Sequence, residues 1–373
     1  MIYLDHAATS PMTATVLRAQ SELSAEAWGN PGGVYGAGRR ARRALDEARA
    51  KLAGILGARP GEIFFTSGGT EADNWAIFET AQVFPDKRHL ITTQIEHHAV
   101  LNPCRWLESQ GWQVTWLKPD REGIVHPEQV REAIRPDTCL ISVQMANNEI
   151  GTIEPIEEIG KVAWENGIRM HTDAVQAVGQ IPVRLRKLPV DLLTLSGHKF
   201  GAPKGIGALY VRAGTRMEPF VHGGGQEKGM RSGTENAIGA SLMALALEEY
   251  RKGDFEAMRG LRNHFIAALT EAFPDVTVNG SRKQRLPGNM HFSIPGIHAD
   301  SLLMQLDLAG IAASAGSACT AGSLNPSHVI SAIGGDEEAA SLRLTLGHEN
   351  TGEELSKVFG CLLRILEKRK DRK

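Results

Sequence analysis

Short apolar segments alternate with amphipathic segments between about residues 60 and 215, and this alternation constrains the fold more than any other feature of the sequence. The apolar segments have the length of buried strands, and the segments between them have helical periodicity. Such alternation produces βαβ crossovers and a mostly parallel sheet with helices on both faces. The expected strands are 62–68, 89–95, 113–119, 138–146, 167–174, 191–197 and 207–212, and the expected helices include 70–84, 126–134 and 156–167.

The rest of the chain predicts a second unit. A long helical stretch at 235–273 leads into two further strand candidates, at 290–296 and 341–347. We therefore expect an α/β protein with a mostly parallel seven-stranded sheet in a large domain and a smaller α+β domain, which the N-terminal segment joins. The large domain is expected to span residues 14–250, and the small domain residues 1–13 together with 251–373.

The charge of the chain is nearly balanced, with 41 Lys and Arg residues against 43 Asp and Glu residues and a net charge of -2. No overall basic field is available to attract nucleic acid or an anionic membrane. Residues 1–10 lack the basic and apolar regions of a secretory signal, and no apolar run approaches the roughly 18 residues of a membrane span. We therefore expect a cytoplasmic protein without nucleic-acid or membrane partners.

The four cysteines lie far apart, in a pattern that fits neither a zinc site nor a disulfide framework. Cys104, Cys139 and Cys361 lie in apolar or helically periodic segments, where a thiol acts as a small core side chain. Cys319 differs because serines and glycines surround it in the stretch SAGSACTAGS. That setting predicts an accessible thiol in a segment with conformational freedom, and so a chemical role.

Ligands of parallel sheets bind at the carboxyl ends of the strands, where this chain carries unusual residues. In FFTSGGTEADN a strand leads through two glycines, the second of which is Gly69, to Thr70 and a helix. The free backbone N–H groups at the start of that helix are suited to cradle a phosphate. The alternative is a plain turn with an N-cap, which the same residues also fit.

Two further strand ends carry a carboxylate and a lysine. One strand ends at Asp173, with Gln176 three residues later. This carboxylate fits an N-cap, and it also fits a partner for a protonated ring nitrogen or a metal. The next strand ends in Ser196, His198 and Lys199 among apolar residues and glycines. Partial burial lowers the pKa of a lysine and makes its amine a nucleophile that can form a Schiff base.

Imidazoles and amides follow two other strands, as His97 and His98 in one case and Asn147 and Asn148 in the other. Adjacent histidines suggest a metal, but no third ligand lies at a suitable spacing, so we predict no metal site. A flat imidazole can instead stack on a flat cofactor. Pyridoxal 5'-phosphate needs all of these groups: a phosphate cradle, a Schiff-base lysine, an aspartate for its ring nitrogen, an amide for its ring oxygen and a stacking imidazole.

A series of segments runs along nearly the whole chain: YLDHAATSP, GNPGGVYGAGR, FTSGGTEADN, EHHAV, NNEIG, HTDAVQAVG, SGHKFGAPKGIG, HGGGQEKGMRSGTEN and SAGSACTAGSLNPSHV. In this order they resemble the cysteine desulfurases of pyridoxal-phosphate fold type I. The long serine- and glycine-rich stretch resembles the branch that serves iron-sulfur cluster assembly and nitrogen fixation. Where the family usually reads Asn-Pro-Ser-Ser followed by a histidine, this chain reads NPGGVY.

The resemblance implies a role for individual residues. Lys199 would hold the cofactor as a Schiff base, Cys319 would accept the sulfur, and His97 would stack on the ring and assist proton transfer. Asp173 would pair with the ring nitrogen, and Asn148 and Gln176 would lie beside the ring oxygen. The phosphate would be held by Gly69, Thr70, Ser196 and His198. The whole cofactor-binding set implied in this way is Gly69, Thr70, His97, Asn148, Asp173, Gln176, Ser196, Gly197, His198, Lys199 and Thr234.

The resemblance also implies how substrate binds and how chains associate. Arg343 matches the residue that binds the substrate carboxylate, a task suited to a bidentate guanidinium, and the alternative is a surface-strand arginine. Asn30 and Asn148 complete the implied substrate-binding set. Thr234 would reach the phosphate of the neighbouring subunit, which implies a homodimer.

The implied activity is pyridoxal-phosphate-dependent removal of sulfur from L-cysteine, which gives L-alanine and a persulfide on Cys319. The sulfur would pass to an acceptor protein such as an iron-sulfur cluster scaffold. A selenocysteine lyase and an aminotransferase of the same fold are alternatives, although an aminotransferase needs no accessible cysteine. A sulfur-transfer scaffold without catalysis is the non-enzyme alternative, and the presence of Lys199, Asp173 and Cys319 together argues against it.

Overall fold

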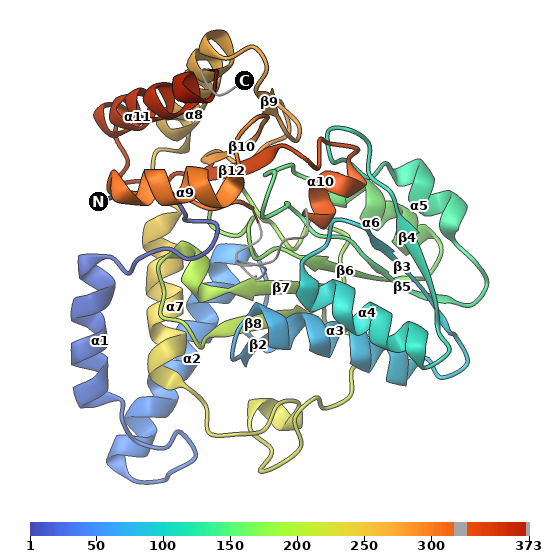
Figure 1. Cartoon of the computed structure of the whole chain (residues 1–373). Helices are drawn as coiled ribbons and strands as arrows, with labels where there is room; N and C mark the ends of the chain where they lie inside the picture. The colour runs from blue at the N-terminus through green and yellow to red at the C-terminus, as the bar shows by residue number, and fades with distance from the viewer. Residues whose placement is uncertain (317–326, 371–373) are drawn as a thin grey trace.

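The computed structural model describes residues 1–316 and 327–370. Its centre is a seven-stranded sheet (Figure 1). Strands β7, β6, β5, β3 and β4 run parallel, whereas β8 is antiparallel to both of its neighbours, β2 and β7. The predicted mostly parallel seven-stranded sheet is therefore confirmed. In sheet order the strands are β2 (Ile63–Thr66), β8 (Gly207–Val211), β7 (Leu192–Ser196), β6 (Arg169–Asp173), β5 (Thr138–Ser142), β3 (His89–Thr93) and β4 (Gln113–Leu117).

Both faces of this sheet are apolar. Successive strand residues point to opposite sides of the sheet, and here both sets of side chains are apolar. Leu90 of β3 and Leu140 of β5 belong to one buried cluster, whereas the next residues, Ile91 and Ile141, belong to another. Helices cover each face, and Figure 1 shows those of one face in front of the sheet. The first face carries α3 (Gly69–Val83) and α4 (His98–Ser109), and the second carries α2 (Gly36–Leu56), α5 (Pro127–Ala133), α6 (Ile156–Glu165) and α7 (Ala237–Tyr250), with α1 (Ala14–Glu26) beside α7.

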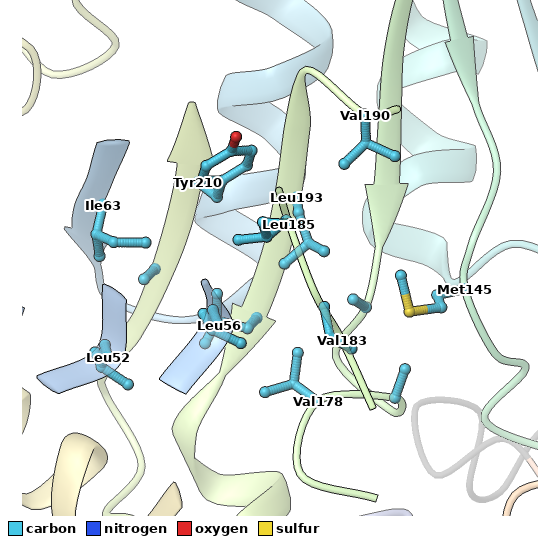
Figure 2. Packing of buried hydrophobic residues seen from close by; sticks show 14 of the residues in the cluster. Leu52, Leu56, Ile63, Met145, Val178, Val183, Leu185, Val190, Leu193 and Tyr210 are labelled. Carbon is cyan, nitrogen blue, oxygen red and sulfur yellow. The ribbon is translucent and has the colours of Figure 1, made fainter. Parts of the chain in front are cut away.

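The larger of these clusters joins α2 to the antiparallel edge of the sheet (Figure 2). Leu52 and Leu56 of α2 pack with Ile63, Leu193 and Tyr210, and each of these side chains is at most 3% exposed. Complete burial of one large apolar side chain stabilises a fold by roughly 1.5–3 kcal/mol. The rigid sheet that results gives the residues at its strand ends fixed positions.

A three-stranded antiparallel sheet forms the centre of a second unit. Its middle strand contributes Phe292 and its edge strand Leu342, and both side chains are buried against three helices. The elements of this unit are β9 (Thr277–Val278), β10 (Asn289–Ile294), β12 (Ala340–Thr345), α8 (Phe255–Ala272), α9 (Ala299–Leu308) and α11 (Gly352–Lys370), with the short helix α10 (His328–Ala332) between α9 and β12 along the chain.

The first residues of the chain pack with this second unit. Strand β1 (Ile2–Tyr3) pairs in parallel with β11 (Ile311–Ala312). The Leu4 side chain is fully buried in a cluster that includes Phe292, Leu342 and Leu362. Residues from the two ends of the chain therefore share one core.

The helical stretch expected at 235–273 is two helices, α7 and α8, and not one. The break contains Gly253 and Asp254. The Asp254 carboxylate accepts a hydrogen bond from the backbone N–H of Ala257 at 2.9 Å and so caps the start of α8. An aspartate that satisfies a first-turn N–H begins a new helix, which explains the difference.

Among the described helices α2 and α11 are long, and each buries only one side. In α2 the residues Leu45, Leu52 and Leu56 recur on the buried side at helical spacing. Within residues 1–316 and 327–370, none of the helices combines the length and the apolar character that a membrane span needs.

The position of Leu4 gives a test of the shared core. We expect Leu4→Ala to lower the free energy of unfolding by about 2–5 kcal/mol, since it leaves a cavity among side chains from both ends of the chain. Leu17→Ala on α1 is the control, because Leu17 is 49% exposed and its loss is expected to cost less than about 0.5 kcal/mol. Urea denaturation followed by circular dichroism measures both, and equal midpoints for the two variants would contradict the shared core.

Candidate active site

The start of α3 forms a cradle of backbone atoms beside the end of β7. Gly68 is the N-cap of α3 and has no side chain to bond the first-turn N–H groups. A Cβ atom at Gly69 would lie 2.9 Å from Val175 and 3.5 Å from the Cβ of Ser196, so only glycine leaves this space open. Thr70 lies inside the first turn, which excludes it as the N-cap of the plain-turn alternative.

Lys199 lies on the 3₁₀ helix η2 (Gly197–Phe200), which follows directly after β7. Its Nζ donates hydrogen bonds to the carbonyl oxygens of Ala7 at 2.6 Å and Ala8 at 2.9 Å. The Ser10 hydroxyl donates to the Lys199 carbonyl at 3.0 Å. The N-terminal segment therefore holds both the backbone and the amine of this lysine.

Two side chains beside Lys199 also contact the N-terminal segment. Gln176 is buried, and its Nε2 donates to the same Ala7 carbonyl at 2.9 Å. The His198 ring is hydrogen-bonded through Nδ1 to the Thr9 hydroxyl at 3.2 Å. Burial, and then the charge of Lys199, lower the pKa of His198 to about 4, so this imidazole is neutral near pH 7.

Asp173 ends β6 and is buried within reach of the Lys199 charge. Burial raises the pKa of Asp173 to about 6, while the Val175 N–H, which donates to its Oδ1 at 2.8 Å, and Lys199 oppose that rise. The carboxylate is therefore largely ionised near pH 7. A cationic ring nitrogen placed beside it would stabilise this charge further.

A second buried carboxyl group, Asp73 of α3, lies behind Asp173. Its Oδ1 is 3.5 Å from Nε2 of His171, and among the described residues this oxygen has no hydrogen-bond partner. Burial first, and then the Asp173 charge, raise the pKa of Asp73 well above its ordinary value. Burial also lowers the pKa of His171 to about 3, so both groups are neutral and Asp173 carries the charge.

His97 is the N-cap of α4, at the end of the turn that follows β3. Its Nδ1 accepts a hydrogen bond from the Ala99 N–H at 3.1 Å, which leaves the proton of the neutral ring on Nε2. Burial, followed by the charge of Lys199, lowers the pKa of His97 to about 4. The ring is therefore neutral near pH 7 and fits a stacking role better than the role of a cation.

Arg343 lies on β12 of the second unit and is 1% exposed, so the alternative of a surface-strand arginine is wrong. Its Nη2 forms an ion pair with Asp5 at 2.8 Å, and its Nη1 donates to the Asn148 carbonyl at 3.0 Å. Among the described residues its buried Nε has no hydrogen-bond partner. An unpartnered guanidinium N–H is a site for an anionic group such as a carboxylate.

The structure brings most of the sequence-predicted residues to one place and leaves others elsewhere. Asn30 and Thr234 are exposed, Asn30 on the loop between α1 and α2 and Thr234 on the segment before α7. Both of these segments lie toward the lower edge of Figure 1. Arg42 connects these two segments, since it donates to the Pro31 carbonyl at 3.3 Å and pairs with Glu235 at 3.2 Å. Cys319 lies outside the described residues, whereas Cys104, Cys139 and Cys361 are buried, as predicted.

Sequence reasoning missed the residues of the N-terminal segment that contact the site. The carbonyls of Ala7 and Ala8 are about 190 positions away from Lys199 along the chain, and Asp5 is separated from Arg343 by 338 positions. A backbone carbonyl gives no signal in an amino-acid sequence. The only indication that this segment contributes to the site was that YLDHAATSP is one of the segments that resemble the family.

The donor set fits pyridoxal phosphate on several observations. The space at Gly69, which a Cβ would close, lies at uncapped N–H groups that suit a phosphate. A buried ionised carboxylate at Asp173 suits a protonated ring nitrogen, and the lysine amine is close enough for its charge to shift the pKa values of both Asp173 and His97. Among the described residues no group of three or more His, Cys, Asp or Glu side chains is arranged to hold a metal.

Comparison with known proteins gives a consistent family. The family model described as aminotransferase class-V matches residues 2–358. Cysteine desulfurase IscS of Dictyoglomus turgidum is 48% identical over 98% of this chain and 95% of its own length. Cysteine desulfurase IscS of Methanosarcina thermophila is 47% identical over 98% of this chain and 92% of its own length.

Solved structures are similar over the same extent. One described as a NifS-like protein has a TM-score of 0.91 and 35% identity, over 98% of this chain and 99% of its own. Another, described as SspA in complex with cysteine, has a TM-score of 0.82 and 36% identity, over 94% of this chain and all of its own.

Glu96, directly before His97, gives a test of the buried electrostatics. Its carboxylate accepts from Gln144 N–H and the Thr93 hydroxyl, yet burial raises its pKa to about 8. Between pH 4.5 and pH 8 the folded state therefore keeps a proton on Glu96 that the unfolded state has released. As the pH rises through this range, the free energy of unfolding falls by up to about 1.4 kcal/mol per pH unit.

We expect Glu96→Gln to remove this dependence, since an amide does not titrate. The free energy of unfolding of the variant, relative to that of the unsubstituted protein, should therefore increase from pH 5 to pH 8. Urea denaturation of the cofactor-free proteins measures this difference. Glu337→Gln, at an exposed position, is the control and should show no such trend. If the free energies of unfolding of Glu96→Gln and the unsubstituted protein differ by the same amount at pH 5 and at pH 8, the pKa of Glu96 is not raised.

Proposed function

Because this chain belongs to the cysteine desulfurases within the class-V aminotransferase family, we propose that it uses pyridoxal 5'-phosphate, held on Lys199, to remove the sulfur of L-cysteine. The products are L-alanine and a persulfide on Cys319. The observation that carries this proposal is the meeting of Lys199 after β7, Asp173 at the end of β6 and the Gly69 cradle after β2, in a chain 48% identical to a cysteine desulfurase.

The cofactor has a residue for each of its parts. Asp173 would hold the ring nitrogen, and its charge is kept because the nearby Asp73 is neutral. The N–H groups that follow Gly68, together with Ser196, would hold the phosphate, and His97 would stack on the ring. When bound, pyridoxal phosphate supplies an electron sink that stabilises negative charge on the substrate and weakens its carbon–sulfur bond.

With cofactor and cysteine bound, Lys199 would serve as the base that moves the substrate proton. A neutral amine has two N–H groups and one lone pair. The carbonyls of Ala7 and Ala8 accept both hydrogens, at 2.6 Å and 2.9 Å, and this orients the lone pair away from them. The amine is then positioned to take the α-proton of cysteine and to return a proton later.

Arg343 binds the substrate carboxylate through its unpartnered Nε, while the Asp5 carboxylate and the Asn148 carbonyl hold its two terminal nitrogens in place. The similarity to SspA, whose structure was solved in complex with cysteine, supports cysteine as the substrate class. The sulfur transfer is balanced. The carbon–sulfur bond of cysteine breaks and a sulfur–sulfur bond forms on Cys319. Of the two thiol hydrogens, one is in the alanine product and the other is on the persulfide.

The persulfide is proposed to pass to an acceptor protein, such as an iron-sulfur cluster scaffold, in the cytoplasm. The relatives named cysteine desulfurase IscS support the desulfurase activity, whose persulfide sulfur needs an acceptor. We also propose a homodimer in which Thr234, exposed in the single chain, contributes to the phosphate site of the partner subunit.

The thiol gives the first test. We expect Cys319→Ser to retain the yellow absorbance of the bound cofactor and to lose persulfide formation by at least about a hundredfold, because the three cysteines that the structure describes are all buried. Intact mass after addition of L-cysteine measures the added sulfur. Cys361→Ala, which removes a buried thiol, is the matched control and should gain sulfur normally; a Cys319→Ser protein that still gains sulfur would refute the assignment.

The proposed homodimer has its own test. We expect Thr234→Val to weaken pyridoxal-phosphate binding by about tenfold, since a hydrogen bond to a charged phosphate contributes roughly 1.5–3 kcal/mol. Fluorescence titration of the cofactor-free protein measures the affinity, and light scattering measures the mass. Thr277→Val on β9 is the control, at an exposed position outside the site. A monomeric protein whose cofactor affinity is unchanged by Thr234→Val would exclude a shared site.

A further inference from the structure

Glu149 is a buried carboxylate for which the proposed chemistry has no use. It is 1% exposed, in the turn that also carries Asn147 and Asn148. The turn is rigid: the Glu149 N–H donates to Asn147 Oδ1 at 2.8 Å, and its carbonyl accepts from the Asn289 side chain at 3.0 Å. Burial of a carboxylate costs free energy, and buried glutamates are therefore rare. We expect a buried glutamate at a candidate active site to have a function.

One oxygen of this carboxylate lies against two chain positions that are close to Cys319 in sequence. The Ser327 hydroxyl donates to Oε2 at 2.6 Å. A Cβ added at Gly316 would lie 2.8 Å from the same Oε2, and the φ angle of this glycine is 124°. Any side chain at Gly316 would therefore collide with the carboxylate. Gly316 directly precedes, and Ser327 directly follows, the ten residues 317–326, which are outside the described part and include Cys319.

Ser327 also begins a helix. Its hydroxyl oxygen accepts from the Val329 N–H at 3.1 Å, so Ser327 is the N-cap of α10. A single hydroxyl thus connects the start of α10 to Glu149, and the Glu149 position fixes where the chain rejoins the fold.

The same turn is connected to the substrate site. Arg343 donates to the Asn148 carbonyl, one residue before Glu149, and its guanidinium is close enough to lower the pKa of Glu149 against the rise caused by burial. The Ser327 hydrogen bond has the same opposing effect. Glu149 is therefore in contact, directly or through one residue, with both flanks of the Cys319 segment and with the group assigned to the substrate carboxylate.

We propose that Glu149 is a positioning residue for sulfur transfer, whose carboxylate holds Ser327 by a hydrogen bond and lies against Gly316, the two described positions that flank residues 317–326. This inference rests on the proposed function, in which Cys319 accepts the sulfur. Glu149 acts through Gly316 and Ser327 and not on substrate or cofactor, so its loss affects the transfer step and spares the binding steps.

The test uses the protein loaded with pyridoxal phosphate. We expect Glu149→Ala to slow persulfide formation on Cys319 by at least about tenfold, because small misplacements of a reacting group have effects of this size. The cofactor absorbance and the cysteine concentration that half-saturates its spectral change should stay within about twofold of the unsubstituted protein. Glu149→Gln, which keeps an oxygen acceptor for Ser327, should restore most of the rate.

Two further variants separate positioning from general damage. Ser327→Ala should slow the transfer as Glu149→Ala does, and the double variant should be no slower than either single variant. Glu154→Ala is the matched control, since Glu154 is also a buried glutamate but accepts from the Val125 N–H at 2.9 Å and not from Ser327. It should transfer sulfur at the normal rate. Equal slowing in Glu154→Ala, or normal transfer in Glu149→Ala, would overturn the proposal.

A second measurement does not depend on turnover. In cofactor-free protein, iodoacetamide should alkylate Cys319 at least about threefold faster in Glu149→Ala and in Ser327→Ala than in the unsubstituted protein, because thiol reactivity follows access. The other three cysteines are buried, so peptide mass reports Cys319. An unchanged alkylation rate would overturn the proposal. Failure of the unsubstituted loaded protein to place sulfur on Cys319 would instead overturn the proposed function, and the two failures are thereby distinguished.

Discussion

The packing of residues 4–10 between the two units is the contact on which the candidate site depends. Leu4 is buried in the core of the second unit, and two carbonyls of the same segment accept the hydrogen bonds of Lys199 on the large sheet. Its Asp5 carboxylate binds Arg343 on β12. One short segment thus contacts both the lysine and the arginine, although Lys199 follows a strand of the seven-stranded sheet and Arg343 lies on a strand of the three-stranded sheet.

Burial decides where charge is kept in this site. Water would screen and stabilise any ionised group, but in the interior each charge persists only with a partner. Asp73 and the buried histidines are neutral for this reason, and Asp173 keeps its charge through the Val175 N–H and Lys199. The site therefore offers one buried negative group, which suits a protonated ring nitrogen, and one amine, which suits a Schiff base, and pyridoxal phosphate requires both.

The sequence was sufficient for the parts of the fold and site that depend on local pattern. Alternating strands and helices predict the parallel sheet, and residues at strand ends such as Asp173 and Lys199 follow from it because the carboxyl ends of parallel strands meet at one edge. The break near Gly253 was missed because helical periodicity continues on both sides of it. The contacts of the N-terminal segment could not be predicted, since backbone carbonyls have no sequence signal and the pairing of Asp5 with Arg343 spans 338 positions.

The central claim is that one chain holds both the amine that activates cysteine and the thiol that takes its sulfur. The most direct test is a single turnover of the loaded protein with one equivalent of L-cysteine that carries a sulfur isotope, followed by peptide mass and alanine analysis. The account predicts that labelled sulfur appears on Cys319 in the same amount as L-alanine. Alanine without labelled sulfur on Cys319, or pyruvate in place of alanine, would contradict it.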